Sequence, residues 1–261
     1  MPAFIEIQGE QLAVDLYEPR ERIADAVLIH GFTGSKEDFE VIGPLLAEMG
    51  YRVLTFDNRG QHESAHSKRN DGYAMQSLAR DAIELAQHYN FEKPHLFGHS
   101  FGGLIAQQAA VDAPNYWASL TLFCSGPHGI PNKPDLDATV QIMETMTMQE
   151  SWNKYKEVTD RGLPRYETYK KRWTASDRRS TKEMAIHLKS VQPLITEIIA
   201  TKIPVHVIYG ENDDAWPLEM QDQMAKDLSA TLTVIKNAGH CPNEDQPVET
   251  AKALANFWRA L

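Results

Sequence analysis

One short pattern, G-x-S-x-G at Gly98-His-Ser-Phe-Gly102, constrains the fold of this chain more than any other feature. It follows a mostly apolar run at 94–97 and precedes the segment 103–111, which is rich in helix formers and holds no helix breaker. Between a buried strand and a helix, this pattern is typical of a sharp turn that presents a serine in a strained backbone conformation. Because glycine has no side chain, Gly98 and Gly102 would let the strand and the helix cross closely. The pattern therefore predicts a strand–turn–helix unit with Ser100 at its turn.

Short apolar segments alternate with amphipathic ones along the first 125 residues and again after residue 202. We expect strands at 4–7, 11–17, 26–30, 52–56, 94–97, 118–124, 204–209 and 231–235. We expect helices at 38–49, 77–89, 103–111 and 247–261, with Gly50 as the C-terminal cap of the first. Strands that are joined by single helices pair in parallel, and the helices then cover both faces of the sheet. The sequence therefore predicts the α/β fold class.

The alternation stops at residues 126–202, which contain only helical patterns and many methionine, tyrosine and tryptophan residues. We therefore expect an α/β core formed by residues 1–125 and 203–261, with a helical insert at 126–202. Residues of these types pack the inside of any helical layer. They also suit a cavity, because methionine is adaptable and Tyr and Trp combine an apolar body with a polar tip. The candidates for a substrate pocket are Met143, Met146, Trp152, Tyr155 and Trp173 in the insert, with Trp216 and Cys124 in the core.

The composition argues against several classes of partner and cofactor. The 261 residues include 26 Lys and Arg and 36 Asp and Glu, a formal net charge of −10 at pH 7, which argues against nucleic acid or an anionic membrane as the main partner. Two cysteines are too few for a disulfide framework and no metal-ligand spacing is visible, so we expect no metal and no cofactor. No basic, apolar leader follows Met1 and no stretch approaches ~18 apolar residues, so we expect a cytoplasmic protein without a membrane span. We expect a monomer or a homodimer.

A serine acts as a nucleophile when a base, an orienting acid and donors for an oxyanion surround it. His240 is the best candidate base, because glycine and proline neighbours place it in a tight loop after the strand at 231–235. The acid is expected in the loop after the strand at 204–209, where Asp213 and Asp214 are adjacent and spacing alone does not separate them. The order serine, acid, histidine and the position of each after a strand favour one shared site at the carboxyl edge of the sheet.

Two backbone N–H groups are the candidate donors for the oxyanion. One belongs to Phe101, which directly follows Ser100, and the other to Phe32, in the glycine-containing loop after the third strand. We expect the rings of Phe32 and Phe101 to face the pocket. His30 and His99 flank these motifs, and we expect them to hold loops through hydrogen bonds.

Five motifs in this order resemble the α/β-hydrolase superfamily over nearly the whole chain. They are His30-Gly-Phe32, Asp57-Asn-Arg-Gly60, Gly98-His-Ser-Phe-Gly-Gly103, Gly210-Glu-Asn-Asp213 with Trp216-Pro217, and Ala238-Gly-His-Cys-Pro242. The resemblance implies a mostly parallel eight-stranded sheet, a helical cap after the sixth strand and a Ser100–Asp213–His240 triad, which favours Asp213 over Asp214. His62 departs from the family pattern, because relatives commonly carry glycine there. His62 would either alter the pocket wall or be a tolerated loop substitution, and we favour the second interpretation.

These observations predict a serine esterase that cleaves a small acyl ester, thioester or lactone with an apolar acyl or alcohol part. The same triad also serves C–C bond hydrolases, lyases, cofactor-free haloperoxidases and acyltransferases, and a ligand-binding relative with slow turnover would keep it too. Epoxide hydrolases and haloalkane dehalogenases are disfavoured, because they carry an aspartate where Ser100 stands. Cys124 and Cys241 are not expected to be nucleophiles, since nothing nearby would lower the pKa of either thiol.

Overall fold

A central eight-stranded sheet organises the part of the chain that the computed structural model describes, which is residues 3–130, 133–155 and 166–261, with Tyr155 as backbone only. The strand order is β1-β2-β4-β3-β5-β6-β7-β8. The strands are β1 (Ala3–Ile7), β2 (Glu10–Tyr17), β3 (Ala24–Ile29), β4 (Tyr51–Phe56), β5 (His95–His99), β6 (Ser119–Phe123), β7 (Val205–Gly210) and β8 (Thr231–Ile235). β2 pairs antiparallel with β1 and β4, and the other neighbouring strands pair in parallel. The mostly parallel α/β sheet expected from the sequence is confirmed.

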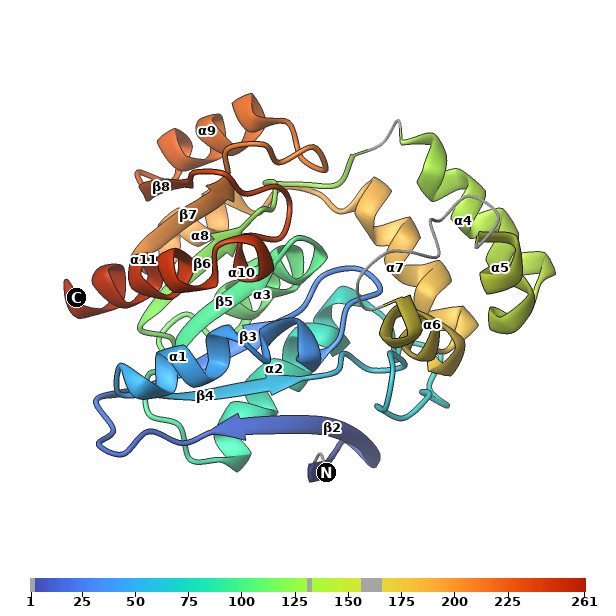
Figure 1. The fold of residues 1–261 in the computed structure, drawn as a ribbon, viewed down its shortest axis with the longest axis horizontal. Coiled ribbons are helices and arrows are strands. Elements are labelled where there is room, and N and C mark those ends of the chain that lie inside the picture. The colour runs from blue at the N-terminus through green and yellow to red at the C-terminus, as the bar shows by residue number, and fades with distance from the viewer. Residues whose placement is uncertain (1–2, 131–132, 156–165) are drawn as a thin grey trace.

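Helices cover both faces of this sheet (Figure 1). α1 (Ile42–Glu48) and α11 (Pro247–Arg259) pack together on one face. α2 (Met75–His88), α3 (Phe101–Asp112) and α8 (Ile195–Thr201) lie on the other. α9 (Leu218–Asp227) packs against β7 and β8, and the short α10 (Pro242–Asp245) precedes α11. The strands between the two layers are buried along nearly their whole length, which explains their continuous apolar sequences.

The segment 38–49 forms two short helices where the sequence predicted one. They are the 3-10 helix η1 (Lys36–Phe39) and α1. Pro44 explains the break, because proline has no N–H for a helical hydrogen bond and its ring clashes with the carbonyl four residues earlier. Proline is tolerated in the first turn of a helix, and Pro44 stands in the first turn of α1. The expected cap is confirmed, since Gly50 adopts φ +98° and donates its N–H to the carbonyl of Ala47 at 3.0 Å.

Between β6 and β7, the regular secondary structure of the described residues is helical throughout. These are α4 (Pro134–Thr145), α5 (Met148–Tyr155), α6 (Tyr166–Ala175), α7 (Arg178–Ser190) and α8. α4 packs on α7 and α5 on α6. Figure 1 shows α4 to α7 beyond one end of the strands, away from the two helical layers that cover the sheet. Among the described residues, no helix combines the length and the apolar character needed to cross a bilayer.

A seam of hydrogen bonds joins the start of α7 to the loop after β4. The N–H of Asp177 donates to the carbonyl of Gly60 at 2.7 Å, and the N–H of His62 donates to Ser176 Oγ at 3.1 Å. His62 has φ +46°, a conformation that favours glycine. Its side chain is buried, with Nε2 at 3.6 Å from Glu37 Oε1. The residue that departs from the family pattern therefore connects the helices of the insert to the core.

Candidate active site

Ser100 stands at the turn between β5 and α3, where its backbone adopts φ 54° and ψ −117°. A residue other than glycine holds such a conformation at a cost on the order of 1–3 kcal/mol, so neighbouring contacts must maintain it. The N–H of Ser100 donates to the carbonyl of Phe123 at 2.9 Å, and Ser125 Oγ donates to the carbonyl of Ser100 at 2.8 Å. The strained turn that the sequence pattern predicted is confirmed.

Two glycines let β5 and α3 cross closely at this turn. A Cβ on Gly98 would lie 2.2 Å from the carbonyl oxygen of Gly102, and a Cβ on Gly102 would lie 2.4 Å from the carbonyl oxygen of Ile29. Both obstacles are backbone atoms, so relief would require β3 or α3 to move. The expected reason for glycine at these two positions is confirmed.

His240 and Asp213 meet in the loops that follow β8 and β7. Nδ1 of His240 lies 2.8 Å from Oδ1 of Asp213. A carboxylate only accepts, so Nδ1 carries the hydrogen, and in the neutral ring Nε2 is the nitrogen that can accept a proton. Asp213 is buried and bonded to the imidazole, whereas Asp214 is exposed. The geometry therefore selects Asp213 as the partner of His240.

The carboxylate of Asp213 is held by two further donors. Gln221 Nε2 of α9 donates to Oδ2 at 2.9 Å, and the N–H of Ala215 donates to Oδ1 at 3.0 Å. Burial alone would raise the pKa of Asp213, but the bonds from His240, Gln221 and Ala215 outweigh it and lower that pKa. Asp213 is therefore an anion at neutral pH, as an orienter of imidazole requires. Gln221 has no signal in the sequence, because a glutamine on an amphipathic helix belongs to no motif that would single it out.

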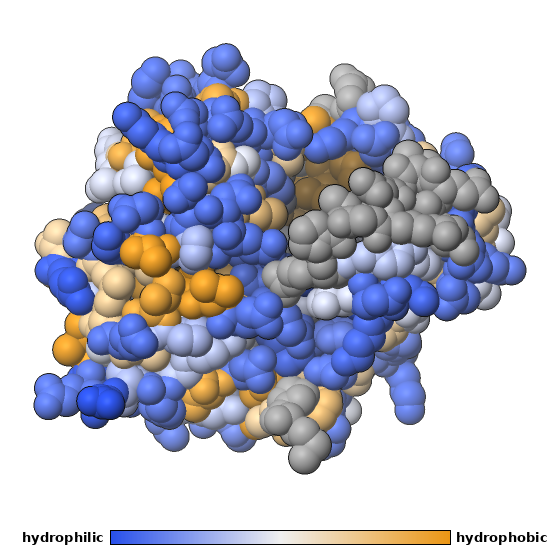
Figure 2. Space-filling view, in the orientation of Figure 1, coloured by the Kyte–Doolittle hydropathy of each residue, from blue (hydrophilic) through white to orange (hydrophobic). Residues whose placement is uncertain are grey.

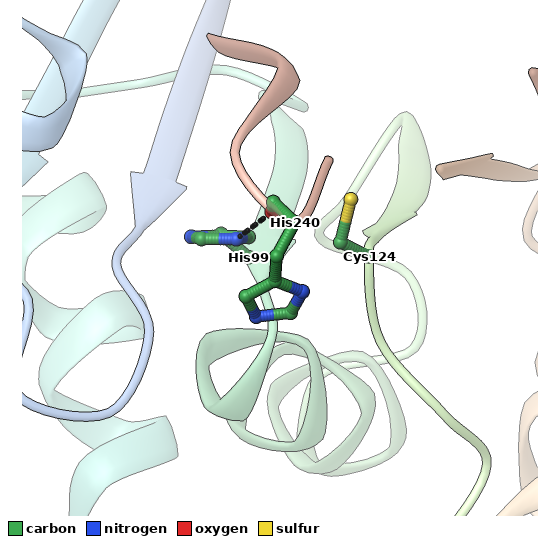
Figure 3. Close-up of side chains that lie close together, drawn as sticks. All are labelled: His99, Cys124 and His240. Atoms are coloured by element: carbon green, nitrogen blue, oxygen red, sulfur yellow. Dashed lines mark hydrogen bonds between the residues drawn. The ribbon is translucent and has the colours of Figure 1, made fainter. Parts of the chain in front are cut away.

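His99 lies beside His240, and Figure 3 shows its bond to that residue. His99 Nε2 donates to the carbonyl of His240 at 2.9 Å, and the ring centroids are 5.0 Å apart. His30 plays a similar part in the loop after β3, where its Nε2 accepts the N–H of Asn58 at 2.9 Å. The expectation that His30 and His99 hold loops through hydrogen bonds is confirmed.

Two clusters in the described residues have the residue types of a metal site. In the first, ligand atoms of His99, Cys124 and His240 lie within 4.8 Å of one another (Figure 3). Burial, with a smaller contribution from Asp213, raises the pKa of the Cys124 thiol well above its ordinary value, so it supplies no thiolate. The facing nitrogens of the two histidines are already engaged, Nδ1 of His240 by Asp213 and Nε2 of His99 by a carbonyl. The cluster therefore offers no thiolate, and one nitrogen of each histidine already has a hydrogen-bond partner.

The second cluster, Glu37, His62 and Glu63, already surrounds an ammonium group. Lys36 Nζ lies 2.7 Å from Glu37 Oε1, 2.8 Å from Glu63 Oε2 and 3.3 Å from Asp57 Oδ2. Burial alone would lower the pKa of Lys36, but these three carboxylates raise it above its ordinary value. The cation of this cluster is therefore Lys36.

The candidate oxyanion donors come from the start of α3, next to Ser100, and from the loop after β3. The N–H of Phe101 is the first of α3, so the helix itself provides it with no acceptor. Phe32 lies in a turn that the N–H of Gly34 closes on the carbonyl of Gly31 at 3.1 Å, and it lines the space next to Ser100. One expectation is wrong. The ring of Phe101 is fully buried and stacks on His187 at a centroid distance of 6.5 Å, because the first turn of α3 directs it into the core.

Two cavities meet at Ser100, and Phe32, Ser100 and His240 line both. The first, of about 300 Å³, is here called the aromatic cavity, because its walls include Trp152, Tyr166, Tyr169 and Trp173. The second, of about 310 Å³, is called the aliphatic cavity, because its walls include Ile130, Leu136, Leu188 and Trp216. Each volume is at the lower end of the range of roughly 300–1,000 Å³ for ligand sites.

The pocket candidates fall into three groups. Trp152, Trp173 and Trp216 line the two cavities. Met143 and Cys124 are buried and line neither cavity within the described residues, and Met146 borders a separate surface hollow between α4 and α5. The side chain of Tyr155 lies outside the described residues. His62 lines neither cavity, which agrees with the favoured interpretation of a tolerated loop substitution.

Comparisons with known proteins agree with this architecture. A family model described as alpha/beta hydrolase fold matches residues 27–247. YugF of Bacillus subtilis, named as an uncharacterized hydrolase, is 25% identical over 245 residues, with 88% of each chain covered. RutD of Variovorax paradoxus is 37% identical over 100 residues, a match that spans 38% of this chain and 37% of that relative.

Solved structures resemble the chain along nearly its whole length. An esterase from Exiguobacterium antarcticum superposes with a TM-score of 0.83 at 20% identity, covering 99% of this chain and 100% of that one. The enol-lactonase from Burkholderia xenovorans superposes with a TM-score of 0.82 at 17% identity, covering 98% of this chain and 99% of that one. At these identities the likeness shows the fold, and the chemistry must be argued from the site.

Proposed function

This chain belongs to the α/β-hydrolase fold family, and within that family we propose that it is a serine hydrolase of small carboxylic esters. The single observation that carries the proposal is the Asp213–His240 bond of 2.8 Å at a cavity shared with Ser100, which sits in a strained turn. Ser100, His240 and Asp213 are the proposed nucleophile, base and orienter. The proposal includes thioesters and lactones, because both present the same acyl carbon to a serine.

The proposed reaction has two halves. Ser100 Oγ attacks the acyl carbon while its proton passes to His240 Nε2, and the N–H groups of Phe32 and Phe101 hold the oxyanion. Collapse of the tetrahedral intermediate breaks the bond to the leaving group, which takes the proton from His240, and an acyl group remains on Ser100. Water then attacks this acyl-enzyme with His240 again as base, and the acid is released. Asp213 stays ionised and stabilises the imidazolium in both halves.

We further propose that residues 126–202 form an insert whose helices α4 to α7 cap a core of residues 1–125 and 203–261, while its last helix, α8, packs on α3. The support is that α5 and α6 supply walls of the aromatic cavity, while α4 and α7 supply walls of the aliphatic cavity. A substrate at Ser100 would be enclosed by these helices and partly shielded from water. The proposed substrates have an apolar acyl or alcohol part, because both cavities have mostly apolar walls.

A fluorophosphonate probe and p-nitrophenyl acetate, butyrate and octanoate test the proposal. We expect the probe to label the wild type at Ser100 and the esters to be turned over at rates that depend on chain length. Ser100→Ala should abolish labelling and lower kcat by several orders of magnitude with an unchanged circular dichroism spectrum. Ser190→Ala, an exposed serine of α7, is the matched control and should change neither. Labelling without ester turnover would contradict the esterase assignment and point to another reaction of the same triad.

A further inference from the structure

The two cavities that meet at Ser100 differ in chemistry, and this difference indicates a substrate class. We propose, on the basis of the ester hydrolysis proposed above, that the substrate joins an aromatic group to a short aliphatic chain. The aromatic group would occupy the aromatic cavity and the aliphatic chain the aliphatic cavity, with the scissile carbonyl between them at Ser100. The two cavities have similar volumes, about 300 Å³ and about 310 Å³.

The rings of the aromatic cavity hold one another in place. The centroid of Trp152 lies 5.4 Å from that of Tyr166 at an interplanar angle of 57°, and 6.4 Å from that of Trp173 at 51°. Trp173 Nε1 donates to Ser151 Oγ at 2.8 Å, which fixes the indole on α6. Tilted rings at these separations present both faces and edges to a ligand, the geometry that a further aromatic ring prefers. The cavity is therefore organised for a flat ring before a ligand arrives.

The charged groups of the aromatic cavity are one guanidinium, Arg172, and two carboxylates, Asp38 and Glu244. The Arg172 guanidinium is buried, forms an ion pair with Asp38 and donates to Ser35 Oγ at 3.0 Å. Its carbon Cζ also lies 4.9 Å from the ring centroid of Tyr169. Because this cation already has a carboxylate partner, it gives little additional affinity for an anionic substrate. The cavity therefore favours a neutral aromatic group over an anionic one.

The walls of the aliphatic cavity include branched aliphatic side chains, which the described walls of the aromatic cavity lack. Leu136 of α4 and Leu188 of α7 are buried and face the same space as Trp216. Lys133 Nζ donates to the carbonyl of Ala215 at 3.2 Å, so this lysine bridges the insert and the loop after β7. Figure 2 shows a recess with hydrophobic walls between α9 and α4. Aliphatic walls discriminate between ligands by their volume, so we expect the aliphatic chain of the substrate to bind until it is longer than the cavity.

Matched ester pairs test this inference in both orientations. Benzyl butyrate is compared with cyclohexylmethyl butyrate, and butyl phenylacetate with butyl cyclohexylacetate, so that a flat aromatic ring is replaced by a puckered saturated one and the rest of the ester is unchanged. In one orientation we expect the aromatic ester to have a kcat/KM about three- to tenfold higher, the scale of one added ring–ring contact. A series from benzyl acetate to benzyl decanoate, with the reversed alkyl phenylacetates, should show an optimum at a short chain.

Variants assign each preference to its cavity. Trp173→Leu should remove the aromatic preference and keep the chain-length optimum, and Trp173→Phe should restore the preference. Leu188→Ala should move the optimum to longer chains, by about two carbons, and keep the aromatic preference. The matched controls are Phe4→Leu and Leu232→Ala, which replace exposed side chains of β1 and β8 and should change neither preference.

The outcomes separate this inference from the proposed function. Turnover of all esters with no aromatic preference in either orientation would overturn the inference and leave the esterase assignment intact. The same holds if Trp173→Leu and Leu188→Ala shift both preferences alike. If the wild type hydrolyses none of the esters, p-nitrophenyl acetate included, the proposed function fails and the inference fails with it.

Discussion

His99 donates its Nε2–H to the carbonyl oxygen of His240 at 2.9 Å, so the residue directly before Ser100 holds the loop that carries the imidazole paired with Asp213. Burial lowers the pKa of His99 to about 4, which keeps this ring neutral above pH ~5. A neutral imidazole has one N–H, and here it is on Nε2. The position of His240 relative to Ser100 therefore depends on this hydrogen bond from a neutral side chain as well as on the bond to Asp213.

The first prediction concerns this bond. His99→Phe keeps an aromatic ring and removes the donor, so the loop of His240 should shift. We expect kcat to fall about 10- to 100-fold, because a displacement of ~1 Å at a catalytic group can cost ~100-fold. His99→Gln, which can donate from Nε2, should recover part of the loss. Ester turnover and the rate of fluorophosphonate labelling measure the effect, with the exposed His88→Phe as control. Labelling of His99→Phe at the wild-type rate would show that the bond is dispensable.

The second prediction concerns Gln221, which donates to Asp213 Oδ2 at 2.9 Å. In Gln221→Glu a protonated carboxyl can still donate to Asp213, whereas an ionised one repels it. The ratio of variant to wild-type kcat should therefore fall about tenfold or more as the pH rises through the range in which the new carboxyl ionises. Gln223→Glu adds the same charge at an exposed position of α9 and should give a flat ratio. A pH-independent ratio for Gln221→Glu would contradict a positioning role.

The third prediction concerns the crossing of β5 and α3. Gly98→Ala would place a methyl group 2.2 Å from the carbonyl oxygen of Gly102, so we expect a loss of unfolding free energy of at least about 3 kcal/mol, or no folded protein. Gly9→Ala is the control. Its methyl group would meet nothing within 4 Å, and φ +78° alone should cost ~1 kcal/mol. Urea titrations measure the free energy of unfolding of both variants and of the wild type. Equal losses of free energy in the two variants would refute the steric argument.

The fourth prediction concerns acid stability. Burial lowers the pKa of four histidines to about 4, namely His30, His95, His99 and His206. The unfolded chain binds protons at these groups near pH 6.5 and the folded chain does not, so their contribution is complete above pH ~6.5 and declines as the pH falls toward 4. Burial raises the pKa of Asp57 and Asp81 to about 6, which acts in the opposite direction and offsets part of the loss.

We therefore expect the free energy of unfolding to fall by on the order of several kcal/mol between pH 7 and pH 4.5. Urea titrations across this range measure the slope. His206→Phe removes one of the four histidines with a lowered pKa and should flatten the slope, while His88→Phe at an exposed position should leave it unchanged. A stability that is constant between pH 7 and pH 5 would contradict the argument.

Local patterns were enough to predict the sheet and the turn at Ser100. The buried strands are continuous apolar runs, and Gly98 and Gly102 stand where backbone atoms leave no room for a Cβ. The prediction of a single helix at 38–49 was wrong. The apolar spacing continues through Pro44, and spacing does not show that proline lacks the N–H that a continuous helix needs.

Contacts between distant segments could not be read from the sequence. Asp213 and Asp214 look alike in a loop, and only the tertiary position of His240 separates them. The bond from Gln221 to Asp213 depends on where α9 packs. The bond from His99 to His240 depends on where the loop after β8 lies. The ring of Phe101 was expected in the pocket, but the direction of the first turn of α3 buries it.

The hydrogen bonds between the loop after β4 and the start of α7 determine which segments must be transplanted together in a chimaera of two relatives. Gly60 and His62 belong to the core by sequence, yet they bond to Asp177 and Ser176 of the insert through backbone N–H and carbonyl groups. A chimaera that transplants residues 126–202 alone would cut this connection. A graft that carries the 57–64 loop along with the helices would preserve it.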